Sequence, residues 1–211
     1  MKIELAQRTW WPFGFTAGIA ALLIVAGCQD YVSIYPFYTE KDLVFEPALV
    51  GFWTEAGETN LDVKAEFKRA GDKKYSLTIH SVNATNATPT TETNAAEVCL
   101  FKLKGQCYMD WDTPAGEKDG PEIPRHKVWK VSRLDSTLEM AGLEYDWLRE
   151  FLKQNPAALR HYLKTPASTN CDIILTADTR ELQRFLGKHA GTPGAFSTNV
   201  LRLVRQERGA M

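Results

Sequence analysis

Apolar and polar residues alternate at every second position between residues 62 and 80. Side chains of a β-strand point to opposite faces in turn, so this period of two predicts strands with one buried and one solvent-exposed face. The Gly71-Asp72 turn divides the stretch into a hairpin, and His80 is on its outward face. The apolar face is formed by Val63, Ala65, Phe67, Tyr75, Leu77 and Ile79.

Two further hairpins follow along the chain. One turns at Gly105, and the other joins residues 127–131 to residues 137–140. The first of these hairpins is considered with Lys102 paired with Gln106. A shift of this register by one residue would change which side chains of the two strands share a face. In that register the inward positions are Cys99, Phe101, Leu103, Cys107, Met109 and Trp111.

The pattern changes to a helical one in the last third of the chain. Asp146 is a suitable N-cap and Pro156 suits the first turn of a continuing helix, so helical structure is expected over about residues 146–163. Asp178 is followed three residues later by a glutamate, which predicts the start of a second helix over residues 178–190.

We therefore expect one mainly β (α+β) domain over residues 48–206. With a first strand at 49–53 and short strands at 171–176 and 196–204, the count is about seven to nine strands, mostly in sequential hairpins. Such an antiparallel β-meander closes into a barrel or folds into a related sandwich, because this removes its edges, and two to three helices are inserted towards the C-terminus. Residues 207–211 are expected to form a tail.

The first 27 residues have the three-part layout of an export signal. Lys2 and Arg8 precede an apolar run from Phe13 to Ala26, and small residues stand immediately before Cys28. This run is short and diluted by glycine, whereas crossing a bilayer takes about 20 apolar residues.

Val25-Ala26-Gly27-Cys28 resembles the lipobox of bacterial lipoproteins. The resemblance implies cleavage between Gly27 and Cys28 and an anchor of three acyl chains on Cys28, and two or more chains hold a protein stably on a membrane. It places the protein in the bacterial cell envelope, and Gln29 after the cysteine favours the outer membrane, facing the periplasm. The alternatives are an uncleaved membrane helix over residues 10–27 or a plain signal peptide with a coincidental cysteine.

Residues 28–47 are expected to be more than a free tether. Disordered linkers are poor in aromatic residues, so this segment is expected to pack on the domain surface with some of its rings buried. The rings are those of Tyr31, Tyr35, Phe37, Tyr38 and Phe45.

Gly51-Phe52-Trp53 resembles the Gly-x-Trp opening of lipocalin-like barrels. The resemblance implies that Trp53 closes the barrel floor against a basic residue from a late strand, for which Arg202 and Arg205 are the two candidates. The lipobox, the sequence around this opening and the segment 175–186 are also similar to uncharacterised bacterial lipoproteins, which supply no activity.

Charge and composition narrow the classes of function. The formal net charge is −1 and the basic residues are scattered, so no surface for nucleic acid is expected. The four histidines stand apart and Cys-x-x-Cys is absent, so the sequence predicts neither a metal site nor a cofactor. Asp110 and Asp112 do not begin a helix-loop-helix calcium loop, because Pro114 and Ala115 occupy positions that need an oxygen ligand and a glycine.

The mature chain has three further cysteines, Cys99, Cys107 and Cys171. An odd number leaves at least one thiol unpaired within the chain. In the register above, Cys107 is only a diagonal neighbour of Cys99 at about 7 Å, which is marginal for a disulfide, so buried free thiols are expected.

These features favour a non-enzymatic envelope protein, held on the membrane by lipidated Cys28, that binds an apolar small molecule or an envelope partner protein. One alternative is an envelope hydrolase whose site is built from distant residues, since no Gly-x-Ser-x-Gly or similar signature occurs. Another is a purely structural protein, because inward aromatic residues also suit a packed core. The residues expected in the interior or a pocket are Trp53, Phe67, Tyr75, Phe101, Trp111 and Trp129.

Overall fold

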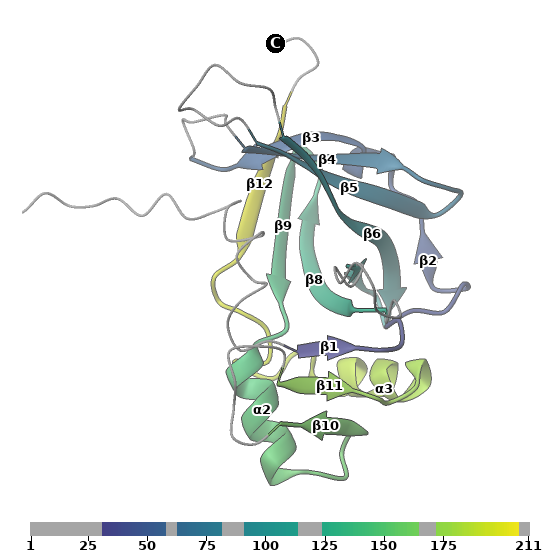
Figure 1. Ribbon diagram of the computed structural model, residues 1–211, viewed down its shortest axis with the longest axis vertical. Helices are drawn as coiled ribbons and strands as arrows, with labels where there is room; N and C mark the ends of the chain where they lie inside the picture. The colour runs from purple at the N-terminus through teal and green to yellow at the C-terminus, as the bar shows by residue number, and fades with distance from the viewer. Residues whose placement is uncertain (1–30, 58–62, 82–90, 114–123, 165–171, 207–211) are drawn as a thin grey trace, which may run out of the picture.

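The computed structural model describes residues 31–57, 63–81, 91–113, 124–164 and 172–206, and its main body is a closed barrel of eight antiparallel strands (Figure 1). Seven strands follow one another from β3 to β9, and β12 pairs with both β9 and β3 to complete the circle. The expected mainly β barrel is therefore confirmed. The barrel strands are β3 (Gly51–Glu55), β4 (Val63–Arg69), β5 (Lys74–Ser81), β6 (Thr91–Leu103), β7 (Gln106–Asp112), β8 (His126–Leu134), β9 (Thr137–Gly142) and β12 (Leu201–Arg205).

A small sheet and two helices lie at one end of the long axis of the molecule (Figure 1). The central strand of this sheet is β11, which pairs in parallel with β1 and antiparallel with β10. The elements of this end are β1 (Tyr31–Ser33), β10 (His161–Leu163), β11 (Ile173–Leu175), α2 (Tyr145–Gln154) and α3 (Thr179–His189).

Strand β8 joins the small sheet to the barrel. Residues 129–134 of β8 pair with β9, whereas its first residue, His126, pairs with Ser33 of β1. Where β1 replaces β9, the Tyr31 hydroxyl accepts from the backbone N–H of Val128 at 3.1 Å and lies 3.3 Å from its carbonyl oxygen. Within residues 31–47, Tyr31 and Phe37 are among the rings that are buried, in line with the expected packing, and β1 in addition belongs to the sheet.

The barrel interior is filled by apolar side chains from every strand. Trp53, Phe67, Tyr75 and Trp111 are buried there, and Trp129 packs against them while half-buried. The buried members of this interior cluster are Leu49, Trp53, Ala65, Phe67, Tyr75, Leu77, Ile79, Ala96, Val98, Leu100, Met109, Trp111, Val131, Leu138, Met140 and Leu203.

A second core lies outside the barrel, between its wall and the helices. Phe101 belongs to this core, and not to the interior, because the predicted register of β6 and β7 is wrong by one residue. Lys104 and Gly105, with φ of 50° and 79°, form a two-residue turn, so Leu103 pairs with Gln106 and Phe101 with Tyr108. Positive φ at both central positions is the geometry that matches the twist of a hairpin.

The same register places the two described cysteines on opposite faces of β6 and β7. Cys99 is buried in the outer core, whereas Cys107 packs against the interior cluster. Both are free thiols, as expected. Cys171 lies outside the described residues.

The late helices differ in how well the sequence predicts them. Helix α3 begins as expected, since the Asp178 carboxylate accepts from the backbone N–H of Glu181 at 3.0 Å. Helix α2 follows Glu144 rather than Asp146, and it ends at Gln154. The expected continuation to residue 163 is wrong, because residues 161–163 form β10 on the edge of β11.

The interior position of Trp53 generates a stability prediction. Its side chain is fully buried and its Nε1 donates to the Leu49 carbonyl at 2.8 Å. Trp53→Ala should therefore lower the free energy of unfolding by about 3–5 kcal/mol, in denaturant melts of a chain starting at Gln29. Phe52→Ala, at the half-buried neighbour on the opposite face, is the control and should cost about 1 kcal/mol or less. Equal losses in the two variants would contradict the assigned role of Trp53.

Candidate functional site: a groove at the barrel floor

One end of the barrel, here called the floor, is crossed by residues 43–50. Strand β2 (Leu43–Val44) pairs with β6, and the chain then turns through the 3-10 helix η1 (Pro47–Leu49) into β3. Leu49 is fully buried in the interior cluster. This segment therefore plugs the barrel at its floor.

The crossing segment is fastened to Tyr75 from inside the barrel. The Tyr75 hydroxyl accepts from the backbone N–H of Glu46 at 2.6 Å and donates to its carbonyl at 3.2 Å. The ring of Phe45 stacks on that of Tyr75, with centroids 5.2 Å apart and planes 11° from parallel. Main-chain hydrogen bonds and ring stacking together fix the position of Phe45.

Arg205 at the end of β12 completes the floor. Its guanidinium donates to the Val50 carbonyl at 2.8 Å. Gly51, at φ 141°, lies directly beneath it, and a Cβ atom there would come within 3.3 Å of the Arg205 Nε. Of the two basic residues that the Gly-x-Trp resemblance suggests, Arg205 lies at the floor, whereas Arg202 pairs with Glu139 at 2.9 Å.

A groove of about 1000 Å³ opens at this floor, beside the start of β3 and the end of β4. Its apolar wall consists of Phe45, Pro47, Val50, Gly51, Phe52 and Phe67. Its polar rim consists of Glu66, Lys68, Arg69, Ser136, Arg205 and Gln206.

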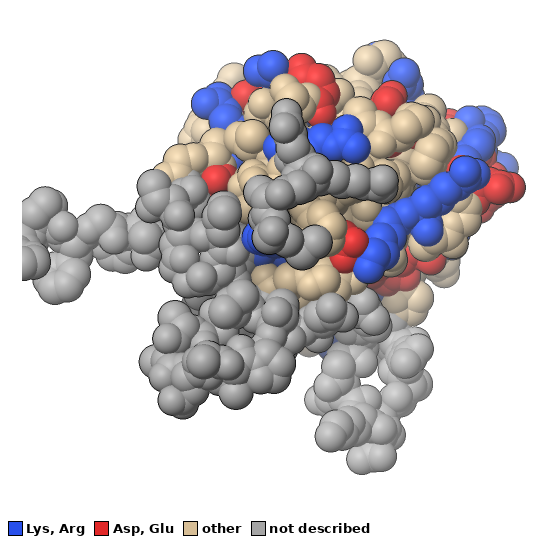
Figure 2. Space-filling view, turned by 90° about the horizontal axis from the view of Figure 1, so that it is seen from above, with Lys and Arg blue, Asp and Glu red and all other residues tan. Residues whose placement is uncertain are grey.

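The rim has an excess of positive charge, with three cationic side chains against one carboxylate. Glu66 is engaged, because Lys68 lies 2.9 Å and His80 2.7 Å from its Oε2. Arg69 covers the Phe45 ring at 4.7 Å and lies 3.6 Å from Asp72, whereas Arg205 forms no ion pair with any residue that the structure describes. Figure 2 looks onto this end of the molecule, where Lys and Arg side chains lie among uncharged side chains and beside several Asp and Glu side chains.

A smaller pocket of about 380 Å³ lies on the other side of Phe45. It is bordered by Leu100, Val131 and Leu134 of the barrel wall and by Cys107. Burial raises the pKa of the Cys107 thiol. The Phe45 ring thus divides the floor into two adjoining hollows.

A polar group that is unrelated to the groove lies in the outer core. Asp110 accepts from the backbone N–H of Phe37 at 2.9 Å, and one of its oxygens lies 2.8 Å from Nδ1 of His126. Burial raises the pKa of the neighbouring Cys99 thiol to about 11, and Cys99 hydrogen bonds to Tyr38. A thiol with that pKa is protonated at neutral pH and is a poor nucleophile. The role of this polar group is structural, because the hydrogen bond from Phe37 to Asp110 fastens the N-terminal segment to the barrel wall.

Two indole groups meet inside the barrel at the end away from the floor. The rings of Trp111 and Trp129 lie 5.1 Å apart, and a Cβ on Gly142 would come within 3.3 Å of the Trp129 ring. Their buried N–H groups have no hydrogen-bond partner within the described part of the chain. Buried donors are normally paired, so these two groups are available to an acceptor at this end.

The structure thus distributes the residues singled out from the sequence among different sites. Phe67 reaches both the interior and the groove, Trp53 and Tyr75 support the floor, and Phe101 lies in the outer core. Gly27 and Cys28 lie outside the described residues. The groove residues Phe45, Phe52 and Arg69 were missed, although the aromatic content of residues 28–47 was a usable signal.

Among the described residues, no helix is both long and apolar enough to cross a membrane.

The Asp110–His126 pair generates a prediction on pH. Burial alone would lower the pKa of His126, but the hydrogen bond and charge of Asp110 outweigh it and raise that pKa above 6.5. Stabilisation by the protonated ring is therefore complete below about pH 6.5 and is lost as the pH rises through the folded-state pKa. In an NMR titration the His126 midpoint should fall below 6.5 in Asp110→Asn, which keeps the shape but removes the charge.

Asp112→Asn is the control for this titration, because Asp112 contributes less to the His126 pKa than Asp110 does. The resonance is assigned by its loss in His126→Gln. An unchanged midpoint in Asp110→Asn would show that the pair does not set the pKa of His126.

No protein-family model, no curated protein and no solved structure matches this chain. The barrel, its floor groove and the lipobox-like tetrapeptide are the features from which its function has to be inferred.

Proposed function

We propose that this protein is a non-enzymatic, membrane-anchored lipoprotein of the bacterial envelope that binds an amphipathic molecule with an apolar body and an anionic head. The floor groove carries this proposal, because it combines an aromatic wall with Arg205, a cation that forms no ion pair among the described residues. The anchor is the lipidated Cys28, and the expected location is the outer membrane, facing the periplasm.

The groove suits such a ligand in size and chemistry. Small-molecule sites have volumes of about 300–1000 Å³ and are mostly apolar with a few placed polar groups. Transfer of an acyl chain from water onto Phe45, Phe52 and Phe67 is favourable by about 0.8 kcal/mol for each buried methylene. A guanidinium presents paired donors that match a carboxylate or phosphate.

The interior of the barrel is less suited to an acyl chain. Tryptophan, phenylalanine and tyrosine side chains fill it from several strands, and Leu49 plugs it at the floor. Protein interiors packed in this way leave few voids larger than a water molecule. The ligand is therefore proposed to lie at the end of the barrel, against the outside of the plug.

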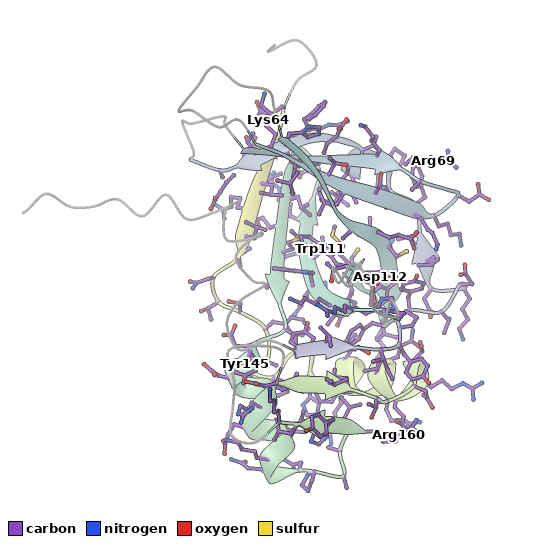
Figure 3. The ribbon with its side chains drawn as sticks, viewed as in Figure 1. Lys64, Arg69, Trp111, Asp112, Tyr145 and Arg160 are labelled. Atoms are coloured by element: carbon purple, nitrogen blue, oxygen red, sulfur yellow. The ribbon has the colours of Figure 1, made fainter. Side chains whose placement is uncertain are left out.

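The groove and strand β1 lie towards opposite ends of the molecule. Arg69 of the rim lies at one end of the long axis, while β1, which begins three residues after Cys28, lies towards the other (Figures 1 and 3). A protein held by Cys28 would therefore keep the groove remote from its point of attachment, where a ligand or a partner protein in the periplasm can reach it.

The anchor is tested by Cys28→Ser. Since the cysteine sulfur is the proposed site of acylation, the variant should leave the membrane fraction or accumulate as an uncleaved precursor, as judged by fractionation and intact mass. Unchanged fractionation together with an unchanged mature mass would refute lipidation at Cys28.

The groove is tested by calorimetric titration of laurate into a chain starting at Gln29. Arg205→Gln should weaken binding by about tenfold, because a hydrogen bond to a charged group contributes about 1.5–3 kcal/mol. The matched control is Arg202→Gln, on the same strand but paired with Glu139, which should leave the affinity unchanged.

Dodecanol, which has no charge, should bind both variants and the native chain alike. Laurate binding that is equally strong in Arg205→Gln would refute the proposed head-group site. The absence of laurate binding to the native chain would refute the amphipathic-ligand proposal and leave a partner protein as the occupant of the groove.

A further inference from the structure

The small sheet of β10, β11 and β1 has two unlike faces. One face is buried, because Tyr31, Ile173 and Leu175 pack in the outer core with both helices. The other carries a row of side chains in register, since Tyr162 pairs with Ile174 and Ile174 with Val32. We refer to Tyr162, Ile174 and Val32 as the apolar row.

The apolar row is exposed to an unusual degree for its composition. Tyr162 is 59% exposed, the largest exposed fraction among the large hydrophobic residues that the structure describes. Ile174 and Val32 beside it are half-buried. Three adjacent apolar side chains in register on one sheet face, one of them largely exposed, form a surface suited to an apolar partner.

Charged residues at the borders of this end are engaged with one another. Arg160 pairs with Asp178 at 3.2 Å and with Glu181 at 2.8 Å. Arg149 lies 4.0 Å from Asp172 and donates to the Tyr145 hydroxyl at 3.2 Å. Figure 3 shows Arg160 and Tyr145 near this end of the molecule. The two arginines thus offset part of the negative charge of Asp172, Asp178 and Glu181, which would oppose contact with an anionic surface.

The position of the proposed lipid identifies the partner. Only three residue steps separate Cys28 from Tyr31, which limits the distance between their Cα atoms to about 10 Å. Tyr31 is fixed by its pairing with Ile173 and by its hydroxyl contacts with Val128. Val32 is one residue further, so the apolar row begins within about 14 Å of the acylated residue.

We infer that the apolar row docks on the lipid bilayer, so that the sheet of β10, β11 and β1 is a membrane-contacting face. This inference rests on the proposed lipidation of Cys28, which brings the bilayer to this end of the molecule. Tyrosine suits the contact, because its ring is apolar and its hydroxyl can remain in the hydrated headgroup layer. The lipid and the apolar row then act as two attachment points, and the second of them limits rotation about the tether.

Hydroxyl-radical footprinting of side chains tests the inference. The lipidated chain is reconstituted in liposomes of phosphatidylethanolamine and phosphatidylglycerol, and a chain from Gln29, which keeps every described residue, is the soluble reference. Oxidation of Tyr162 should be at least about threefold slower in the liposomes, because docked apolar faces lie below the headgroups. Phe52, at the floor, should be oxidised at the same rate in both.

Ile174→Asp places a carboxylate in the middle of the apolar row and leaves Tyr162 as the reporter. In liposomes this variant should return the oxidation rate of Tyr162 to that of the soluble chain. Val204→Asp, at an apolar position of β12 that is somewhat more exposed than Ile174, is the control and should leave Tyr162 protected. Circular dichroism checks that each variant is folded, and Val32→Asp replaces Ile174→Asp if the latter is not.

The outcomes separate this inference from the proposed lipidation. Chain that sediments with liposomes but has an unchanged Tyr162 rate would overturn the docking face while lipidation stands. Chain that does not sediment would overturn both. Protection of Tyr162 in the soluble chain that grows with protein concentration would show that a second copy, and not the bilayer, covers the apolar row.

Discussion

The division of strand β8 between two neighbours is the constraint on which the architecture depends. Its later residues pair with β9 and so close the barrel, while its first residue pairs with β1 and so starts the small sheet. The Tyr31 hydroxyl satisfies the backbone of Val128 at the point of divergence. Because a buried unpaired backbone group costs about 1–3 kcal/mol, this hydroxyl lets the two sheets separate without leaving an orphaned donor.

The same division explains why the molecule has two apolar cores on either side of one wall. Strands β6, β7 and β8 bury both faces, with Val98, Leu100 and Met109 towards the interior and Cys99, Phe101 and Tyr108 towards the helices. The outward faces of strands β4 and β5 carry polar side chains instead, of which Glu66 and Thr78 are buried and Lys68 is exposed. The helices and the small sheet are therefore supported by the barrel, and the N-terminal segment is fastened between them through Phe37 and Asp110.

This difference also decides how much could be predicted from the sequence. The pairing of β4 with β5 follows from clean alternation, because only one register keeps Phe67 and Leu77 inside and Lys68 and Ser76 outside. Residues 98–101 are all apolar, so hydrophobicity does not specify the register of β6, and the Lys104-Gly105 turn decides it instead. Helix α3 was predictable from its capping residue Asp178, whereas β10 depends on pairing with β11, which is distant in sequence.

The floor groove could be predicted only in part, for a related reason. The Gly51-x-Trp53 pattern pointed to Arg202 or Arg205. The choice between them depends on which end of β12 lies at the floor, and that is set by the pairing of β12 with β3. Phe45, Phe52 and Arg69 meet there because three separate segments converge on the plug, and no local pattern contains that information.

The barrel wall connects the floor at one end of the molecule to the small sheet at the other. Leu49 and the crossing segment make the floor rigid, with Tyr75 and Arg205 each bound to its backbone. A groove built on a rigid plug loses little conformational entropy when a ligand binds, so more of the contact free energy appears as affinity. At the other end, β1 transmits any load on the N-terminus directly into β8 and β11. The barrel wall between them is thus a rigid spacer, and this suits the proposal of a binding site that works at a distance from a membrane anchor.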